Sequence, residues 1–125
     1  MATDQKEKSD TLEERLLDFA ARTGKMVDAL PENRLAKHVA GQLIHSATSP
    51  APNYAEACGA ESKKDFVHKL SIALKELRES RVWLKLIVKA ELLPEQRVCE
   101  LNGECEQLCN IIAKSIITAK TQPGP

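Results

Sequence analysis

The stretch from Ser62 to Leu93, SKKDFVHKLSIALKELRESRVWLKLIVKAELL, is the feature that most constrains how this chain can fold. It contains neither Gly nor Pro, and Ser62 can cap a helix together with Asp65 three residues later. One strip of apolar residues recurs at helical spacing and predicts the face that packs on the rest of the chain. The residues of this strip are Phe66, Leu70, Ala73, Leu77, Leu84 and Val88.

A second apolar strip lies on roughly the opposite side of the same predicted helix, where an ordinary surface helix carries charged residues. Its members are Ile72, Val82, Trp83, Leu86 and Ala90. A helix that is apolar on two sides is either central in its own bundle or covered by a second chain, and the residues alone leave both readings open. Since the chain can form few other helices, we favour a second chain and treat these five residues as a candidate oligomer interface.

Helical periodicity on either side of this stretch predicts three more helices, over residues 10–30, 32–47 and 95–120. Pro31 and Pro94 suit the first turn of the helices that follow them, because proline has no N–H to leave unpaired there. Short connections favour antiparallel neighbours. The fold prediction is therefore all-α: an antiparallel up-and-down four-helix bundle with a long third helix, formed by residues 10–120, with disordered tails at 1–9 and 121–125. The predicted buried strip of the second helix is Leu35, Ala36, Val39, Ala40, Leu43, Ile44 and Ala47.

Composition agrees with a helical protein, since 42% of residues are hydrophobic, 29% are charged and only 3% are aromatic. The formal net charge is zero, so there is no overall attraction to nucleic acid or to an anionic membrane. The N-terminus is charged, and no apolar run is long enough to span a bilayer. We therefore expect a cytoplasmic protein with no membrane partner.

Charge is nevertheless uneven along the chain, because residues 62–93 carry eight Lys or Arg against four Asp or Glu. Five of these cations fall on one side of the predicted long helix and form a candidate contact surface for RNA or DNA. They are Lys75, Arg78, Arg81, Lys85 and Lys89. The alternative, which we favour, is a solvated face whose cations pair with Glu76, Glu79 or acids of the first helix.

No pattern of catalytic residues is present: the sequence lacks a phosphate-binding loop, paired carboxylates and a nucleophile with a His and an acid. His38 and His45 lie seven residues apart, but no carboxylate or Cys completes a metal site with them. We therefore predict no enzymatic activity, no cofactor, no metal and no small-molecule substrate. Four cysteines without a C-x-x-C pair are interpreted as small core or surface residues: Cys58, Cys99, Cys105 and Cys109.

The segment from Ser49 to Gly59 interrupts the helical pattern. Its prolines predict a break after the second helix, with Asn53 capping a short helical segment and Gly59 ending it in a left-handed conformation. Asn53, Tyr54 and Glu56 could form a binding site at this corner. Capping and turn formation explain the same residue types, and we favour that structural reading.

The residues from Asn53 to Ile87 carry a resemblance to a known family. The matching positions are Asn53-Tyr54-Ala55-Glu56-Ala57, Ser62, Asp65-Phe66, Lys69-Leu70, Ile72-Ala73-Leu74, Glu76, Glu79 and Trp83-Leu84. The segment resembles the bacterial four-helix-bundle proteins encoded by intervening sequences of 23S ribosomal RNA genes. This resemblance implies a small cytosolic bundle that assembles into homopentamers and has no established enzymatic activity. A related branch is basic and binds nucleic acid as an accessory to reverse transcriptases, and this chain differs from it in having zero net charge.

Overall fold

The computed structural model describes the backbone of residues 2–122 and the side chains of residues 11–122. The chain is mostly helical in this range, with short loops between the helices, and contains no strand there. Its helices are α1 (Ala2–Val27), α2 (Arg34–Thr48), α3 (Pro50–Cys58), α4 (Lys63–Lys89) and α5 (Glu95–Thr121). The predicted all-α class is therefore confirmed. The predicted third helix, α4, has 27 residues and so does α5, which means that its length does not set it apart.

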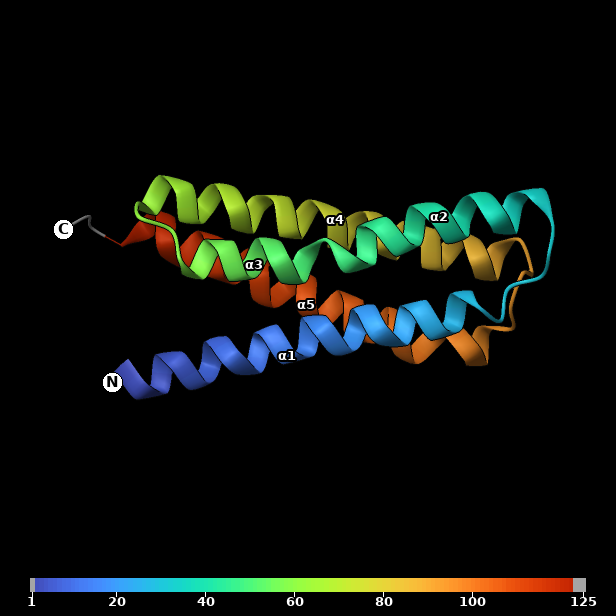
Figure 1. Cartoon of the computed structure of the whole chain (residues 1–125), viewed down its shortest axis with the longest axis horizontal. Helices are drawn as coiled ribbons and strands as arrows, with labels where there is room; N and C mark the ends of the chain where they lie inside the picture. Colours follow the sequence, from blue (N-terminus) through green and yellow to red (C-terminus); the bar gives the residue numbers. More distant parts are fainter. Residues whose placement is uncertain (1, 123–125) are drawn as a thin grey trace.

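The helices lie lengthwise beside one another, with α2 and α3 following each other as one bent rod (Figure 1). α1 contacts α2, α3 and α5, and α4 contacts the same three helices. Within the described part of the chain, α1 and α4 do not contact each other, and neither α2 nor α3 contacts α5. The four rods therefore surround one shared core, with α1 diagonally opposite α4.

The start of α4 agrees with the sequence prediction, because Ser62 is its N-cap and accepts a hydrogen bond from the Asp65 backbone N–H at 3.0 Å. Its end was predicted at Leu93, but the helix stops at Lys89. The Leu92 N–H donates to the Ile87 carbonyl and Glu91 adopts a φ of 57°, which is the Schellman ending of a helix. This tight ending is followed directly by Pro94, the N-cap of α5.

The corner between α2 and α4 differs from its prediction. The break is limited to Ser49, and α3 starts at once with Pro50 in its first turn. Asn53 is not a cap, because it lies inside α3 and donates through its side-chain amide to the Ser49 carbonyl at 3.0 Å. Gly59 is not left-handed, since its φ is −96°. The start of α2 was also misplaced: Asn33 caps it, and Pro31 lies in the preceding loop.

The first helix was predicted to start near Asp10, after a tail without order. The structure extends α1 back to Ala2. Residues 2–9 are mostly polar helix formers, and lengthening an existing helix costs far less than starting a new one. At the other end α5 stops at Thr121, and the predicted tail residues 123–125 lie outside the described range.

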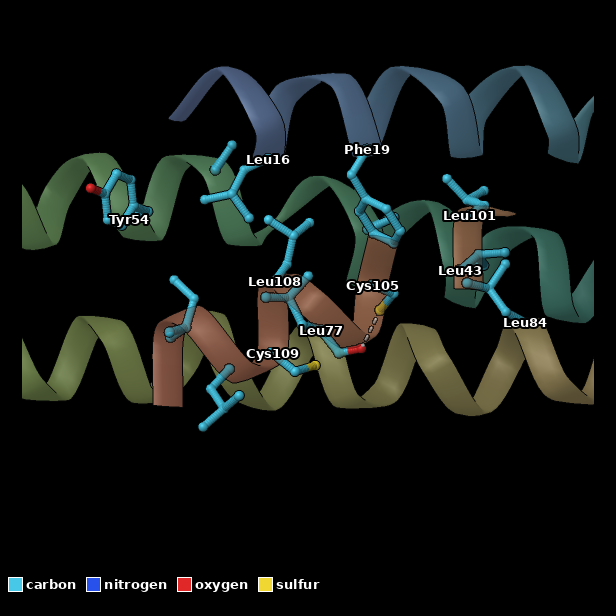
Figure 2. Packing of buried hydrophobic residues seen from close by; sticks show 14 of the residues in the cluster. Leu16, Phe19, Leu43, Tyr54, Leu77, Leu84, Leu101, Cys105, Leu108 and Cys109 are labelled. Atoms are coloured by element: carbon cyan, nitrogen blue, oxygen red, sulfur yellow. Dashed lines mark hydrogen bonds between the residues drawn. The ribbon is translucent and has the colours of Figure 1, made fainter. Parts of the chain in front are cut away.

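Apolar side chains from all four rods form one core, part of which is shown in Figure 2. Phe19 of α1, Leu43 of α2 and Leu77 of α4 are completely buried in it. The core strip of α4 was predicted correctly at Leu70, Ala73, Leu77 and Leu84, whereas Phe66 and Val88 are only half-buried. Ser46 and Ser80 are also completely buried, and the Ser80 hydroxyl donates to the Ser46 hydroxyl at 2.8 Å, which links α2 to α4.

Candidate interaction surface on α4

None of the five residues predicted as an oligomer interface is fully buried within the protomer. Val82 is 59% exposed, and the other four, Ile72, Trp83, Leu86 and Ala90, are half-buried. Trp83 and Leu86 also touch the margin of the core. The protomer therefore covers the second apolar strip of α4 only in part.

Trp83 lies at the edge between α4 and α2. Its ring meets the imidazole of His38 edge to face, with the ring centroids 6.0 Å apart. Its indole N–H donates to the Glu79 carboxylate at 3.2 Å, one turn earlier on α4. The polar atom of the indole is thus satisfied within the protomer, while part of its apolar surface stays accessible.

The apolar surface continues from α4 onto α2. Leu35 of α2 is 43% exposed, although its sequence pattern placed it in the buried strip. α2 and α4 run in opposite directions, and the Ser46–Ser80 contact fixes their register (Figure 1). Leu35 therefore lies near the end of α4, at the level of Ala90. We call Leu35, Val82, Trp83, Leu86 and Ala90 the α2–α4 apolar edge.

A second apolar surface occurs where α1 meets α2. Leu17 is 46% exposed and Ile44 is 45% exposed. Arg15 and Arg22 of α1 reach α5, and Leu17 lies roughly 200° around α1 from Arg15, so it points away from that side. Ile44 lies roughly 200° around α2 from Ser46, which faces α4, so it points away from α4. The sequence pattern placed Ile44 in the core because it could not show how wide a strip each neighbouring helix covers.

The predicted basic stripe is present on the surface of α4. Lys75, Arg78, Lys85 and Lys89 are exposed, and none of them forms an ion pair among the described side chains. Arg81 differs because it is half-buried and reaches Glu106 of α5 at 3.9 Å. The acids of α1 were predicted as alternative partners, but among the described residues α1 does not contact α4.

A groove of about 310 Å³ lies between the second half of α4 and the first half of α5. Leu84, Val88 and Val98 supply its apolar surface, and Lys85 and Lys89 of the basic stripe line it as well. The side-chain oxygen of Asn102 also borders the groove, where it is buried and has no hydrogen-bond partner among the described residues. The basic stripe therefore borders a concave surface rather than a flat one.

The corner residues have structural roles. Tyr54 is 8% exposed and its ring is part of the core (Figure 2). Glu56 forms an ion pair with Lys69 of α4 at 3.0 Å, and Asn53 bonds to the Ser49 carbonyl and hydroxyl. These contacts hold α3 to α2 and α4, which agrees with the structural reading of the corner.

The cysteines fall into two groups, since Cys58 and Cys99 are exposed while Cys105 and Cys109 are buried. The thiol of Cys105 donates to the Leu77 carbonyl at 3.2 Å. Hydrogen bonding to the Cys109 thiol and burial raise the pKa of Cys105, whereas the Cys105 thiol, Arg81 and Arg78 lower the pKa of Cys109. Of the two, Cys109 loses its proton first.

Among the described residues, no three His, Cys, Asp or Glu side chains are grouped so that they could hold a metal ion. No helix within that part of the chain is long and apolar enough to cross a membrane. His38 and His45, considered above as metal ligands, are both exposed on α2, and His38 packs on Trp83 instead.

These features define a small all-α protein of packed helices that exposes apolar surface along two of its edges. The chain belongs to the family of 23S rRNA-intervening sequence proteins, whose sequence profile matches residues 11–114. The family resemblance inferred from Asn53 to Ile87 is thereby confirmed.

The chain is also similar to a solved structure, described as a protein with unknown function from the S23 ribosomal protein family of Bacteroides thetaiotaomicron VPI-5482. The two are 28% identical with a TM-score of 0.78, over 84% of this chain and 97% of the other. No curated protein matches the chain.

Proposed function

We propose that this chain is a non-enzymatic, cytoplasmic protein that works as a homo-oligomer of antiparallel up-and-down bundles, with five subunits as the expected number. Its role is that of a scaffold or interaction module. The observation that carries this proposal is the α2–α4 apolar edge, where Val82 is 59% exposed and Trp83 and Leu86 are only partly covered. Apolar surface of this kind, bordered by charged residues, is typical of a protein–protein contact.

The presence of two different apolar edges supports a ring rather than a symmetric dimer. A two-fold dimer uses the same patch on both subunits, whereas a ring of three or more joins two unlike patches head to tail. The α2–α4 apolar edge and the Leu17–Ile44 surface are two such patches, and they point in different directions around α2. Packing one edge on the other in successive subunits would cover both.

The test is the solution mass of a variant with Val82→Glu and Leu86→Glu, measured by sedimentation. We expect wild-type protein to sediment as a multiple of 13.8 kDa and the variant to shift toward a single chain. Ile117→Glu is the matched control, because Ile117 of α5 is 63% exposed and lies outside both edges. If the wild type is assembled and the double variant has the same mass, the interface does not lie at this position.

A second candidate function is binding of RNA or DNA through the basic stripe. The observation in its favour is that four of its five cations are exposed and unpaired among the described side chains, beside the α4–α5 groove. Ring assembly would repeat the stripe in every subunit and strengthen its field, which the zero net charge of the chain otherwise keeps weak.

Binding of single-stranded and double-stranded RNA, measured from low to high salt, tests this candidate. Lys85→Glu with Lys89→Glu should weaken the binding and reduce its salt dependence, because each lost phosphate contact lowers the number of released counterions. Lys114→Glu with Lys120→Glu, on exposed positions of α5, is the control. If RNA is not retained at any salt concentration, the stripe is a solvated face.

A further inference from the structure

Two buried thiols lie one helical turn apart on α5. Cys105 is 0% exposed and Cys109 is 6% exposed, and Figure 2 shows both on the part of α5 that packs against α4. Residues at positions i and i+4 of a helix share one face. The Cys105 sulfur is fixed by its hydrogen bond to the Leu77 carbonyl, 3.2 Å away. The function proposed above makes no use of these thiols.

The helix geometry determines what can join the two sulfurs. Side chains four residues apart on a helix have Cβ atoms about 5–6 Å apart. A disulfide needs Cβ atoms about 3.5–4.5 Å apart, so it would require α5 to deform. A metal ion between two thiolates, at metal–sulfur distances of about 2.3 Å, needs sulfurs roughly 4.5 Å apart and leaves the helix intact.

The surroundings determine which kind of ion fits. No His, Asp or Glu is grouped with the two cysteines as a third ligand among the described residues. Zn(II) requires four ligands and is disfavoured, whereas thiolates select soft ions such as Cu(I), and two sulfurs are enough for such an ion.

A cationic side chain is available to balance the charge of such a site. Arg81 of α4 packs in the same α4–α5 seam, and its charge acts on Cys109. Its Nε is buried and has no hydrogen-bond partner among the described residues. A buried donor without a partner is costly, and a nearby metal-bound thiolate would give it an acceptor.

We propose that Cys105 and Cys109 bind one Cu(I) ion as a two-coordinate dithiolate. On binding, each thiol releases one proton to solvent and each sulfur donates one electron pair to the ion, whose oxidation state does not change. The Cys105 hydrogen bond to the Leu77 carbonyl is given up. The product carries one net negative charge and lies near the Arg81 guanidinium, which also pairs with Glu106 at 3.9 Å. The site lies within one protomer, so it is independent of assembly.

The experiment uses the full chain with Cys58→Ser and Cys99→Ser, which removes the two exposed thiols. The reduced protein is titrated without oxygen against the Cu(I) complex of bicinchoninate, and copper transfer is followed by the loss of the colour of that complex. We expect transfer of one Cu(I) per chain and a new thiolate-to-copper absorption in the ultraviolet. If the chelator keeps all the copper, the proposal is overturned.

Two variants on that background test the ligands. Cys109→Ser and Cys105→Val should each weaken Cu(I) binding at least 100-fold, and circular dichroism identifies which of them folds. Cys105→Val keeps an apolar side chain in the core, and Cys109 lies at the seam. The two substitutions therefore perturb the fold at different places. Undiminished binding by either folded variant overturns the site. Zn(II) binding as tight as that of Cu(I) overturns the two-coordinate assignment.

Arg81 is proposed as a positioning residue that acts through the thiolates. Arg81→Gln should weaken Cu(I) binding by about 10–100-fold, the range found when outer-shell partners of metal ligands are removed. Lys75→Gln, at an exposed position on the outer side of α4, is the matched control and should have no effect. Equal affinities of the two variants would overturn the role of Arg81 in charge compensation.

Discussion

Along the α1–α5 edge the two helices are joined by ion pairs, whereas the α2–α4 edge carries an aromatic contact and leaves apolar side chains in solvent. Arg15 reaches Glu104 through two hydrogen bonds of 2.7 and 3.1 Å, and Arg22 reaches Glu100 at 3.1 Å. The hydrogen bond to Glu104 raises the pKa of Arg15. On the other edge His38 packs on Trp83, and Leu35 and Val82 stay exposed.

The difference indicates which edge is complete in a single chain. The polar edge has its partners in place and gains little from burial, because exposed charges are already well solvated. The apolar edge would gain about 25 cal/mol for each Å² removed from water. An edge that is stabilised by further burial is where a second subunit is expected to bind.

The largest change in stability is expected for a residue on the buried side of α4, and it is compared here with a residue on the exposed side. Leu77 is completely buried, so Leu77→Ala should lower the free energy of unfolding by about 2–5 kcal/mol in urea titrations. Val82→Ala removes an exposed side chain and should act mainly through assembly, so its effect should depend on protein concentration. A loss with Val82→Ala that is equally large at all concentrations would mean that this position serves the protomer core.

A smaller effect is expected on the polar edge. Arg15→Ala should lower the free energy of unfolding by about 1 kcal/mol or less, because its ion pair with Glu104 is partly buried but still in contact with water. Arg22→Ala should have no measurable effect, since its partner Glu100 is 85% exposed. Both variants should keep the wild-type mass in solution. A change in mass with Arg15→Ala would mean that the α1–α5 edge also takes part in assembly.

A small effect of opposite sign is expected at a position outside both edges, which serves as a reference for them. Glu91 ends α4 with a φ of 57°, a conformation that costs a residue with a Cβ about 1 kcal/mol relative to glycine. Glu91→Gly should therefore raise the free energy of unfolding by up to about 1 kcal/mol without changing the mass. A loss of stability would show that the Glu91 side chain makes a contact that outweighs its backbone strain.

The sequence predicted the parts of the fold that depend on local chemistry and strong periodicity. The Ser62 cap, the opening of α5 after Pro94 and the burial of Leu70, Leu77 and Leu84 were all correct. The left-handed residue was expected at Gly59 but occurs at Glu91, because the tight connection to Pro94 imposes that conformation whatever the residue type.

Features that depend on packing between helices were harder to predict. Leu35 and Ile44 were placed inside, yet they are 43% and 45% exposed, because the width of a buried strip depends on where the neighbouring helices sit. Ile87 is completely buried but fits neither predicted strip of α4. The relation of Cys105 to Leu77 and of Arg81 to Cys109 arises only when α5 packs on α4.

The most direct test of the account is the mass of the wild-type assembly by native mass spectrometry at micromolar concentration. The α2–α4 apolar edge predicts a particle of two or more 13.8 kDa chains, and the family resemblance implies five. A single 13.8 kDa species at every concentration tested would contradict the account, because Val82, Trp83 and Leu86 would then remain in water in the functional protein.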